Sequence, residues 1–264
     1  MDVDRGKGLF IPLIAAMSLF GCNLQYNMLY YPGTGVPAAA ELAARRIQFW
    51  PSGQTGYRGF IGAAGTGKGT VIVFHGNAGT AADRTYYTDA LGALGYRVIL
   101  AEYPRYGLRE GSLGEKAFVA DARSTVRLAL QTYGEPLFLL GESLGCAVAA
   151  AVSRDDSLKI AGLLLITPWD TLAAVSQSHF PWLPVRLFLK DRYDSQENLR
   201  SFSGRVAVVA AERDEIVPLK HARSLYQSLP EAKKFWLIEG AGHNDWLDGI
   251  DAARWREWMQ FVAG

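Results

Sequence analysis

Six short apolar runs recur along the chain from residue 71 onward. They cover residues 71–74, 98–101, 137–140, 163–166, 206–211 and 235–238, and none of them alternates apolar with polar positions. A strand without that alternation is buried on both faces, which is typical of a parallel sheet covered by helices. The runs therefore predict the strands of a mostly parallel sheet.

Segments with the apolar spacing of an amphipathic helix separate these runs. They lie at about 80–94, 115–133, 144–154, 218–229 and 245–262. Such alternation of strands and helices favours a single α/β doubly wound domain. Residues 23–68, which are rich in Gly, Pro and aromatic residues, predict a lead-in arm with two or more antiparallel strands.

One long interval, between residues 166 and 206, breaks this rhythm. It carries a cluster of aromatic residues that includes Trp169, Phe180 and Trp182. An interval this long and this apolar predicts a helical excursion rather than a flexible loop.

Composition narrows the class of protein. The chain has 264 residues, of which 49% are hydrophobic and 20% charged, and its formal net charge is +1. These values argue against a disordered chain and a polytopic membrane protein, and they give no electrostatic reason to expect nucleic acid. Two cysteines, Cys22 and Cys146, are too few for a disulfide scaffold or a thiolate zinc site. The four histidines form no metal-binding motif, so we expect neither a metal nor a cofactor.

The N-terminus has the organisation of a secretory signal. Arg5 and Lys7 precede an apolar stretch at 9–20, which is too short to span a bilayer. Its ending, Leu-Phe-Gly-Cys at 19–22, resembles the lipobox of bacterial lipoproteins, although Phe20 stands where a small residue is usual. The resemblance implies that Cys22 carries a lipid and becomes the mature N-terminus, and Asn23 after it favours the outer membrane. The alternatives are an uncleaved, membrane-adsorbed N-terminus or a plain signal in which Cys22 is incidental.

Residues 141–145 read Gly-Glu-Ser-Leu-Gly, a GxSxG motif between an apolar run and an Ala-rich helical stretch. At such a strand-to-helix turn the serine adopts a strained backbone conformation, and the flanking glycines avoid collisions with neighbouring backbone. We therefore expect Ser143 to point toward solvent at the carboxyl edge of the sheet, above a helix N-terminus. Cys146 then lies in the core as a structural thiol.

A serine nucleophile needs a base that a carboxylate orients. His243, in a glycine-containing loop after the last apolar run, and Asp214, directly after the run at 206–211, are the best placed. Weaker candidates exist for both roles. We expect a solvated or capping role for His221 in its predicted helix, while His179 lies in the excursion, and the remaining candidate acids are Glu212, Glu215, Asp170 and Asp245.

Acyl transfer also needs N–H donors for the developing oxyanion. One is the backbone N–H of Leu144, directly after the nucleophile. The run at 71–74 leads into His-Gly-Asn-Ala-Gly at 75–79, and we assign the second donor to Asn77. His75 is interpreted as a residue that pins this loop by hydrogen bonding. A P-loop-like segment at 62–70 has Gly69 where the Mg²⁺-binding hydroxyl belongs and precedes a strand, so we interpret it as a hairpin or connecting turn.

Five ordered motifs resemble those of the α/β-hydrolases with an HGN-type oxyanion loop, which include membrane-associated serine hydrolases and protein depalmitoylases. They are His-Gly-Asn at 75–77, Glu-Tyr-Pro-Arg-Tyr-Gly at 102–107, the GxSxG motif, Arg-Asp-Glu at 213–215 and Gly-His-Asn-Asp at 242–245. Cys146 and Arg105 depart from the family's usual glycines. The resemblance implies an α/β-hydrolase fold with about eight strands. Together with the signal pattern at 1–21, it predicts an arm at 22–56 and a hydrolase domain at 57–264 with a cap at about 168–200.

The expected function is that of a serine hydrolase acting on small-molecule or lipid-like acyl esters or thioesters, anchored in the cell envelope by an N-terminal lipid. Ser143, His243 and Asp214 would form the triad, with Asn77 and Leu144 as oxyanion donors. Trp169, Phe180 and Trp182 either line an acyl pocket or pack as ordinary helix residues. Amide or peptide cleavage uses the same triad and stays open, as does a binding protein that has lost activity.

Overall fold

The structure is a computed structural model that describes residues 25–62, 65 and 67–264. The predicted signal at 1–21 and Cys22 lie outside these residues. No helix in the described ranges is long and apolar enough to cross a membrane.

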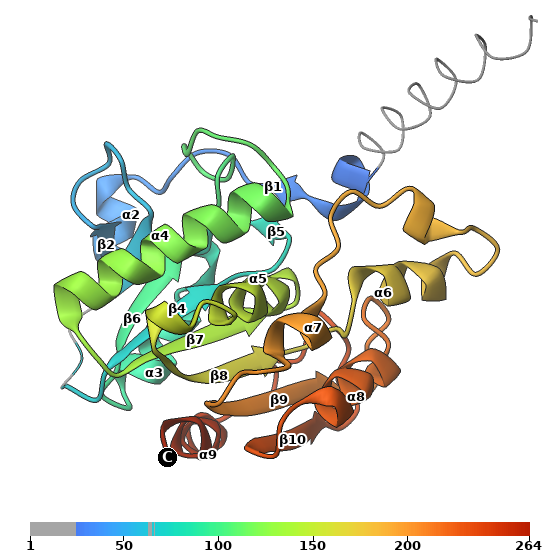
Figure 1. Ribbon diagram of the computed structural model, residues 1–264. Helices are drawn as coiled ribbons and strands as arrows, with labels where there is room; N and C mark the ends of the chain where they lie inside the picture. The colour runs from blue at the N-terminus through green and yellow to red at the C-terminus, as the bar shows by residue number, and fades with distance from the viewer. Residues whose placement is uncertain (1–24, 63–64, 66) are drawn as a thin grey trace, which may run out of the picture.

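An eight-stranded sheet forms the centre of the molecule, with strand order β10-β9-β8-β7-β4-β6-β3-β2 (Figure 1). All neighbours run parallel except β3, which is antiparallel to both β6 and β2. The strands are β2 (Ile47–Trp50), β3 (Gly59–Gly62), β4 (Thr70–Phe74), β6 (Arg97–Ala101), β7 (Leu137–Glu142), β8 (Ile160–Ile166), β9 (Arg205–Ala211) and β10 (Lys233–Ile238). The mostly parallel sheet of about eight strands is confirmed, and each apolar run lies in a strand. Its edge strand β2 comes from within residues 22–56.

Helices cover both faces of this sheet. In β4, Ile72 and Phe74 face one apolar cluster with α4 (Glu115–Tyr133), α5 (Leu144–Ser153) and α8 (Leu219–Ser228). Val71 and Val73 face a second cluster with α2 (Ala39–Ala44), α3 (Tyr86–Gly92) and α9 (Ala252–Ala263). Because both faces are covered, the central strands need no polar alternation.

Helix boundaries follow the sequence except at two helices. The segment predicted at about 80–94 consists of the 3-10 helix η1 (Ala81–Arg84) and then α3, which begins only at Tyr86. The α4 bounds match the predicted 115–133, whereas α9 begins at Ala252 rather than at 245. Gly249 has φ +83°, which ends any helical path through it, and the Asp251 side chain then accepts a hydrogen bond from Arg254 N–H at 2.8 Å. This N-cap defines the true start of the helix.

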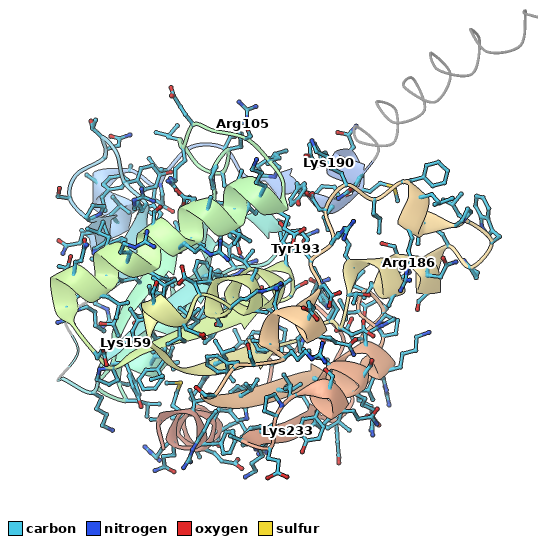
Figure 2. All side chains as sticks on the ribbon, viewed as in Figure 1. Arg105, Lys159, Arg186, Lys190, Tyr193 and Lys233 are labelled. Atoms are coloured by element: carbon cyan, nitrogen blue, oxygen red, sulfur yellow. The ribbon has the colours of Figure 1, made fainter. Side chains whose placement is uncertain are left out.

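The interval between β8 and β9 is a helical excursion, as predicted. It contains α6 (Leu172–His179), the short helix η3 (Val185–Leu187) and α7 (Ser195–Leu199). Residues 180–190 form its tip, which reaches away from the sheet on the right of the view, where Arg186 and Lys190 are labelled (Figure 2). We call residues 180–190 the excursion tip.

The N-terminal arm lies against the loop that follows β4. Residues 25–29 are helical, and β1 (Tyr31–Pro32) pairs in parallel with β5 (Ala78–Gly79). Two short 3-10 helices complete the described elements: η1 (Ala81–Arg84) and η2 (Asp156–Leu158). The P-loop-like segment at 62–70 connects β3 to β4, which are not neighbours in the sheet. It is therefore a strand-to-strand connection and not a hairpin.

Candidate active site

Ser143 stands at the sharp turn between β7 and α5. Its backbone has φ +52° and ψ −114°, and its N–H donates to Ile166 O at 2.9 Å. A Cβ at Gly145 would lie 1.8 Å from Phe74 O, and one at Gly141 would lie 2.4 Å from the Cys146 Cα. Both glycines of GxSxG are therefore required by the close approach of backbone. Ser143 itself is 6% exposed, at the floor of a cavity rather than out in solvent.

His243 and Asp214 complete a hydrogen-bonded series from the serine. The Ser143 Oγ lies 2.9 Å from His243 Nε2, and His243 Nδ1 lies 2.8 Å from Asp214 Oδ2 and 3.0 Å from Oδ1. Asp214 Oδ1 also accepts from Ile216 N–H at 3.0 Å and Val217 N–H at 2.6 Å. These backbone donors fix the carboxylate, which in turn holds Nδ1 protonated and leaves Nε2 free to accept the serine proton.

The other candidate acids lie outside this series. Glu212 accepts from Gly240 N–H, Glu215 from His243 N–H and Asp245 from Gly242 N–H, so all three brace the histidine loop through its backbone. Carboxylates from two loops, one after β9 and one after β10, therefore serve as acceptors for the free backbone N–H groups of the histidine loop.

The predicted oxyanion loop lies beside the same cavity as Ser143. Neither the Asn77 nor the Leu144 backbone N–H donates to another residue in the described part of the chain. Leu144 begins α5, so its N–H is one of the unpaired donors of a helix N-terminus. Gly76, Asn77 and Ser143 line the same cavity. Both N–H groups are therefore unengaged, as donors to a bound oxygen would have to be.

Asn77 is held by three hydrogen bonds, none of which uses its backbone N–H. Its side-chain Nδ2 donates to Leu29 O at 2.9 Å, and its carbonyl accepts from Tyr31 N–H at 2.9 Å and the Tyr106 hydroxyl at 2.6 Å. Two of these partners belong to the N-terminal arm. The arm therefore helps to position a loop more than forty residues further along the chain.

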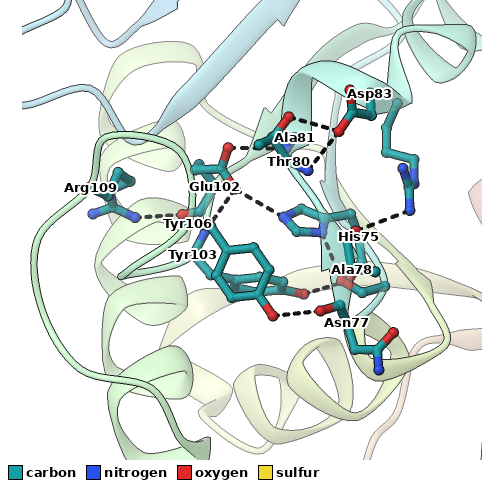
Figure 3. Close-up of polar contacts among 12 residues, drawn as sticks. His75, Asn77, Ala78, Thr80, Ala81, Asp83, Glu102, Tyr103, Tyr106 and Arg109 are labelled. Atoms are coloured by element: carbon teal, nitrogen blue, oxygen red, sulfur yellow. Dashed lines mark hydrogen bonds and ion pairs between the residues drawn. The ribbon is translucent and has the colours of Figure 1, made fainter. Parts of the chain in front are cut away.

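His75 pins the same loop, as predicted. The ring is buried, with Nε2 3.1 Å from Glu102 Oε1 and Nδ1 2.7 Å from Gly76 O. Glu102 also accepts from Ala81 N–H at 3.0 Å, and the Tyr103 hydroxyl donates to His75 O at 2.8 Å (Figure 3). With both ring nitrogens engaged, His75 is not available as a second base.

A cavity of about 260 Å³ opens at the nucleophile. Its wall is formed by residues of the loop after β4, of η1 and α3, of the end of β7 and of the loop after β10, namely Gly76, Asn77, Ala78, Arg84, Tyr86, Glu142, Ser143, His243, Asn244, Trp246 and Leu247. Trp169, Phe180 and Trp182 do not line it. Trp169 is buried and donates from Nε1 to Tyr193 O at 3.2 Å, while Trp182 is exposed at the excursion tip. Our expectation that these aromatic residues form the pocket does not hold for this cavity.

Sequence reasoning missed a polar cluster in the cavity wall. Glu142 Oε1 lies 3.2 Å from Arg84 Nε, and Oε2 accepts from the hydroxyls of Tyr86 at 2.7 Å and Tyr87 at 2.8 Å. Burial, followed by the charge of Glu142, raises the pKa of Tyr86, so the phenol stays protonated and donates. The sequence did contain a signal for this cluster, because a charged residue, Glu142, directly precedes Ser143 in the GxSxG motif.

A second serine, histidine and aspartate are joined in the same manner between the excursion and α8. His221 Nε2 lies 2.9 Å from Ser178 Oγ, and His221 Nδ1 lies 3.0 Å from Asp170 Oδ1. The expected solvated or capping role of His221 is therefore wrong, because its side chain is buried in this contact. His179, which follows Ser178 in the chain, donates from Nε2 to Ile216 O at 2.8 Å.

Cys146 is a buried thiol, as expected. Its Sγ donates to Gly141 O and Ile166 O, both at 3.1 Å. Burial raises the pKa of this thiol well above its usual range, so the sulfur stays protonated and unreactive. It packs directly behind the nucleophile turn.

Several known proteins are similar to this chain in sequence. A family model described as serine aminopeptidase, S33, matches residues 65–190. An uncharacterised protein of Mycobacterium tuberculosis is 34% identical over 274 aligned residues, covering 96% of each chain. A lysophosphatidylserine lipase of Danio rerio is 29% identical over 182 residues, covering 62% of this chain and 48% of that one.

Solved structures agree on the fold. An esterase of Pyrococcus furiosus superposes with a TM-score of 0.67 at 16% identity, over 89% of this chain and 99% of the esterase. A monoacylglycerol lipase of Paleococcus ferrophilus gives a TM-score of 0.57 at 18% identity, over 76% and 96% of the two chains. The chain therefore has the α/β-hydrolase fold, and it belongs to the same family as the mycobacterial protein.

Proposed function

We propose that this protein is a serine hydrolase that cleaves carboxylic esters or thioesters through an acyl-enzyme. The observation that supports this best is the series Ser143, His243 and Asp214, with successive separations of 2.9 Å and 2.8 Å, at the floor of a cavity. The two unpaired N–H groups of Asn77 and Leu144 supply the complementary site for negative charge.

The chemistry follows from these contacts. Ser143 Oγ attacks the acyl carbon while His243 Nε2 takes its proton, and Asp214 stabilises the imidazolium that forms. The carbonyl oxygen becomes an oxyanion held by the Asn77 and Leu144 N–H groups. Collapse of this intermediate breaks the bond to the alcohol or thiol, which leaves with the proton from His243. Water, activated by the same histidine, then releases the acid and regenerates Ser143.

Two other functions are compatible with these residues. The matching family model is described as a serine aminopeptidase, which favours amide cleavage as the second candidate. A binding protein without activity is the third, although every group needed for catalysis is present. Lipid-like esters are the preferred substrates because the names of the Danio and Paleococcus proteins describe lipases.

Labelling with a fluorophosphonate probe tests the mechanism without knowledge of the substrate. We expect labelling of the wild-type chain and of Ser178→Ala, which removes the serine of the second cluster, and none of Ser143→Ala. An unlabelled but folded wild-type protein would favour the inactive binding protein. Matched p-nitrophenyl esters of increasing chain length and p-nitroanilides then separate esterase from amidase activity.

We further propose that Cys22 carries a lipid that anchors the protein in the cell envelope, at the periplasmic side of the outer membrane. The lipobox-like ending of residues 19–22 supports this proposal. Radiolabelled palmitate fed to expressing cells should label the wild-type chain and not Cys22→Ala. Equal labelling of the two would show that the lipid is not attached at Cys22.

A further inference from the structure

The excursion tip exposes large apolar side chains to solvent. Trp182 is 78% exposed, Leu187 is 79% exposed and Phe188 is 36% exposed. They are held in a defined loop, because Gln177 Nε2 donates to Phe180 O at 2.9 Å and Pro181 O at 3.0 Å, while Val185 is buried beneath them. Clustered apolar exposure on an ordered loop is characteristic of a surface that binds something.

Trp182 differs from every other tryptophan of the chain. The other six are at most 7% exposed and belong to the core: Trp50, Trp169, Trp236, Trp246, Trp255 and Trp258. Tryptophan is favoured at the boundary between water and lipid, where its ring is apolar and its N–H can still form a hydrogen bond. A tryptophan exposed to water can still donate its N–H to water, but its apolar ring stays hydrated at a free-energy cost.

The exposed side-chain charges between residues 180 and 192 are all positive, although Glu115 of α4 lies beside them and accepts from Arg192 N–H at 2.6 Å. Arg186, Lys190 and Arg192 are exposed, whereas Asp191, the sole acidic residue between 180 and 192, is buried. Asp191 accepts hydrogen bonds from Gln25 Nε2 at 3.0 Å and the Tyr30 hydroxyl at 2.7 Å, so its charge is directed inward. The chain as a whole has a net charge of only +1, and this excess of positive charge is therefore local.

The N-terminal arm enters the fold beside this tip. Gln25 Oε1 accepts from Lys190 N–H at 2.7 Å, and the Lys190 ammonium lies 5.4 Å from the centre of the Tyr26 ring. In Figure 1 the start of the arm and the excursion lie together at the same end of the molecule. In the sequence, the apolar stretch 9–20 ends only a few residues before Gln25. A membrane that holds the N-terminus, through this stretch or through a lipid on Cys22, would therefore lie within a few residues of Gln25 and so next to the tip.

We propose that the excursion tip docks on the surface of an anionic phospholipid membrane. Trp182, Leu187 and Phe188 would enter the interfacial region, while Arg186 and Arg192 would lie among the lipid phosphates, as in other interfacial segments that combine apolar and basic side chains. The N-terminal segment and the tip would then be two adjacent contacts, which fix the orientation of the protein on the membrane. The proposal concerns a surface away from Ser143 and does not depend on the catalytic mechanism.

Fluorescence quenching tests this contact, with Trp182 as a built-in probe. The full chain is reconstituted into vesicles of phosphatidylcholine with brominated acyl chains, with or without phosphatidylglycerol. We expect brominated lipid to quench an emission component that Trp182→Phe lacks, more strongly when phosphatidylglycerol is present. The double variant Arg186→Glu, Arg192→Glu should reduce this quenching severalfold. The double variant Arg254→Glu, Arg256→Glu on α9, which lies away from the excursion in Figure 1, reverses the same number of charges; it is the matched control and should leave the quenching unchanged.

Three results would overturn the proposal. In the first, aqueous acrylamide quenches Trp182 equally with and without vesicles, while brominated lipid has no effect. In the second, Trp182 is shielded in detergent and Leu187→Ser dissociates a dimer, which would assign the surface to a second copy of the chain. In the third, Trp182 is shielded in a monomer without lipid, which would assign the surface to residues 9–20 folded back on it. Circular dichroism establishes that each variant is folded, and fluorophosphonate labelling measures the catalytic site separately.

Discussion

The two serine, histidine and aspartate clusters of this protein have almost the same hydrogen-bond geometry. In the cavity, the Ser143 to His243 and His243 to Asp214 separations are 2.9 Å and 2.8 Å. Between the excursion and α8, the Ser178 to His221 and His221 to Asp170 separations are 2.9 Å and 3.0 Å. The histidine and the acid are largely buried in both.

What differs is the setting of each serine. Ser143 has a positive φ at a strand-to-helix turn, faces a cavity and lies near two unpaired N–H groups. Ser178 lies within α6, and its hydroxyl is 3.2 Å from Ala174 O of the preceding helical turn. It does not line the cavity at Ser143. A hydrogen-bonded series is therefore not enough for nucleophilic catalysis, which also needs access to the acyl carbon and donors for the oxyanion.

The largest expected effect separates the two serines. Ser143→Ala should lower kcat for an activated ester by a factor on the order of 10⁵ or more, because the nucleophile is lost. Ser178→Ala should leave kcat within about twofold, since only a hydrogen bond between helices is removed. Steady-state kinetics on both purified variants measures this ratio. A comparable loss in Ser178→Ala would show that the second cluster takes part in catalysis.

The two acids give the next comparison. Asp214→Asn should lower kcat by about 10⁴, as expected when the acid no longer fixes the histidine tautomer. Asp170→Asn should have little effect on kcat, because His221 touches neither the cavity nor Ser143. Near-normal activity in Asp214→Asn would mean that a neighbouring carboxylate, such as Glu215, can replace it.

The strand and nucleophile positions were predictable because they depend on local sequence. Uninterrupted apolar runs mark strands buried on both faces, and GxSxG encodes a turn that only glycines permit at positions 141 and 145. The relative positions of Ser143, Asp214 and His243 also followed, since all three come directly after parallel strands whose carboxyl ends share one edge of the sheet.

The cavity wall and the second cluster could not be predicted, because they depend on contacts between residues far apart in the sequence. Arg84 meets Glu142 across 58 positions of the chain, and His221 meets Asp170 across 51. Such pairings depend on how loops and the excursion pack, which periodicity does not encode. The aromatic residues at 169, 180 and 182 looked like a pocket because hydrophobicity is the same signal for core, pocket and exposed surface.

A smaller effect tests the link between the arm and the oxyanion loop. Asn77→Ala keeps the proposed N–H donor but removes the bond from Nδ2 to Leu29 O. We expect kcat to fall by about tenfold with little change in KM, because a loop displaced by a fraction of an ångström stabilises the transition state less well. Tyr106→Phe, which removes the hydroxyl donor to Asn77 O, should have a similar but weaker effect. Unchanged kcat in both variants would mean that the arm does not position this loop.

The smallest effect concerns stability and its dependence on pH at the second cluster. Burial would raise the pKa of Asp170, but the hydrogen bonds from His221 and from Thr171 N–H outweigh it and lower the pKa. The folded protein therefore binds this proton less tightly than the unfolded chain does. The stabilisation is complete above the unfolded pKa of about 3.9 and is lost as the pH falls through the folded value.

Asp170→Asn should therefore lower the free energy of unfolding by about 1–3 kcal/mol near pH 6, the cost of weakening a buried hydrogen bond to His221. Urea denaturation of the two proteins at a series of pH values measures the difference. It should stay constant down to about pH 5 and narrow below about pH 4, because the Asp170 carboxyl of the unfolded wild-type chain then binds a proton that the folded protein does not yet bind. Asp156→Asn, at an exposed position, is the control and should change stability by less than about 0.5 kcal/mol. A difference that widens in acid would show that the folded state binds the Asp170 proton more tightly, contrary to the contacts that surround it.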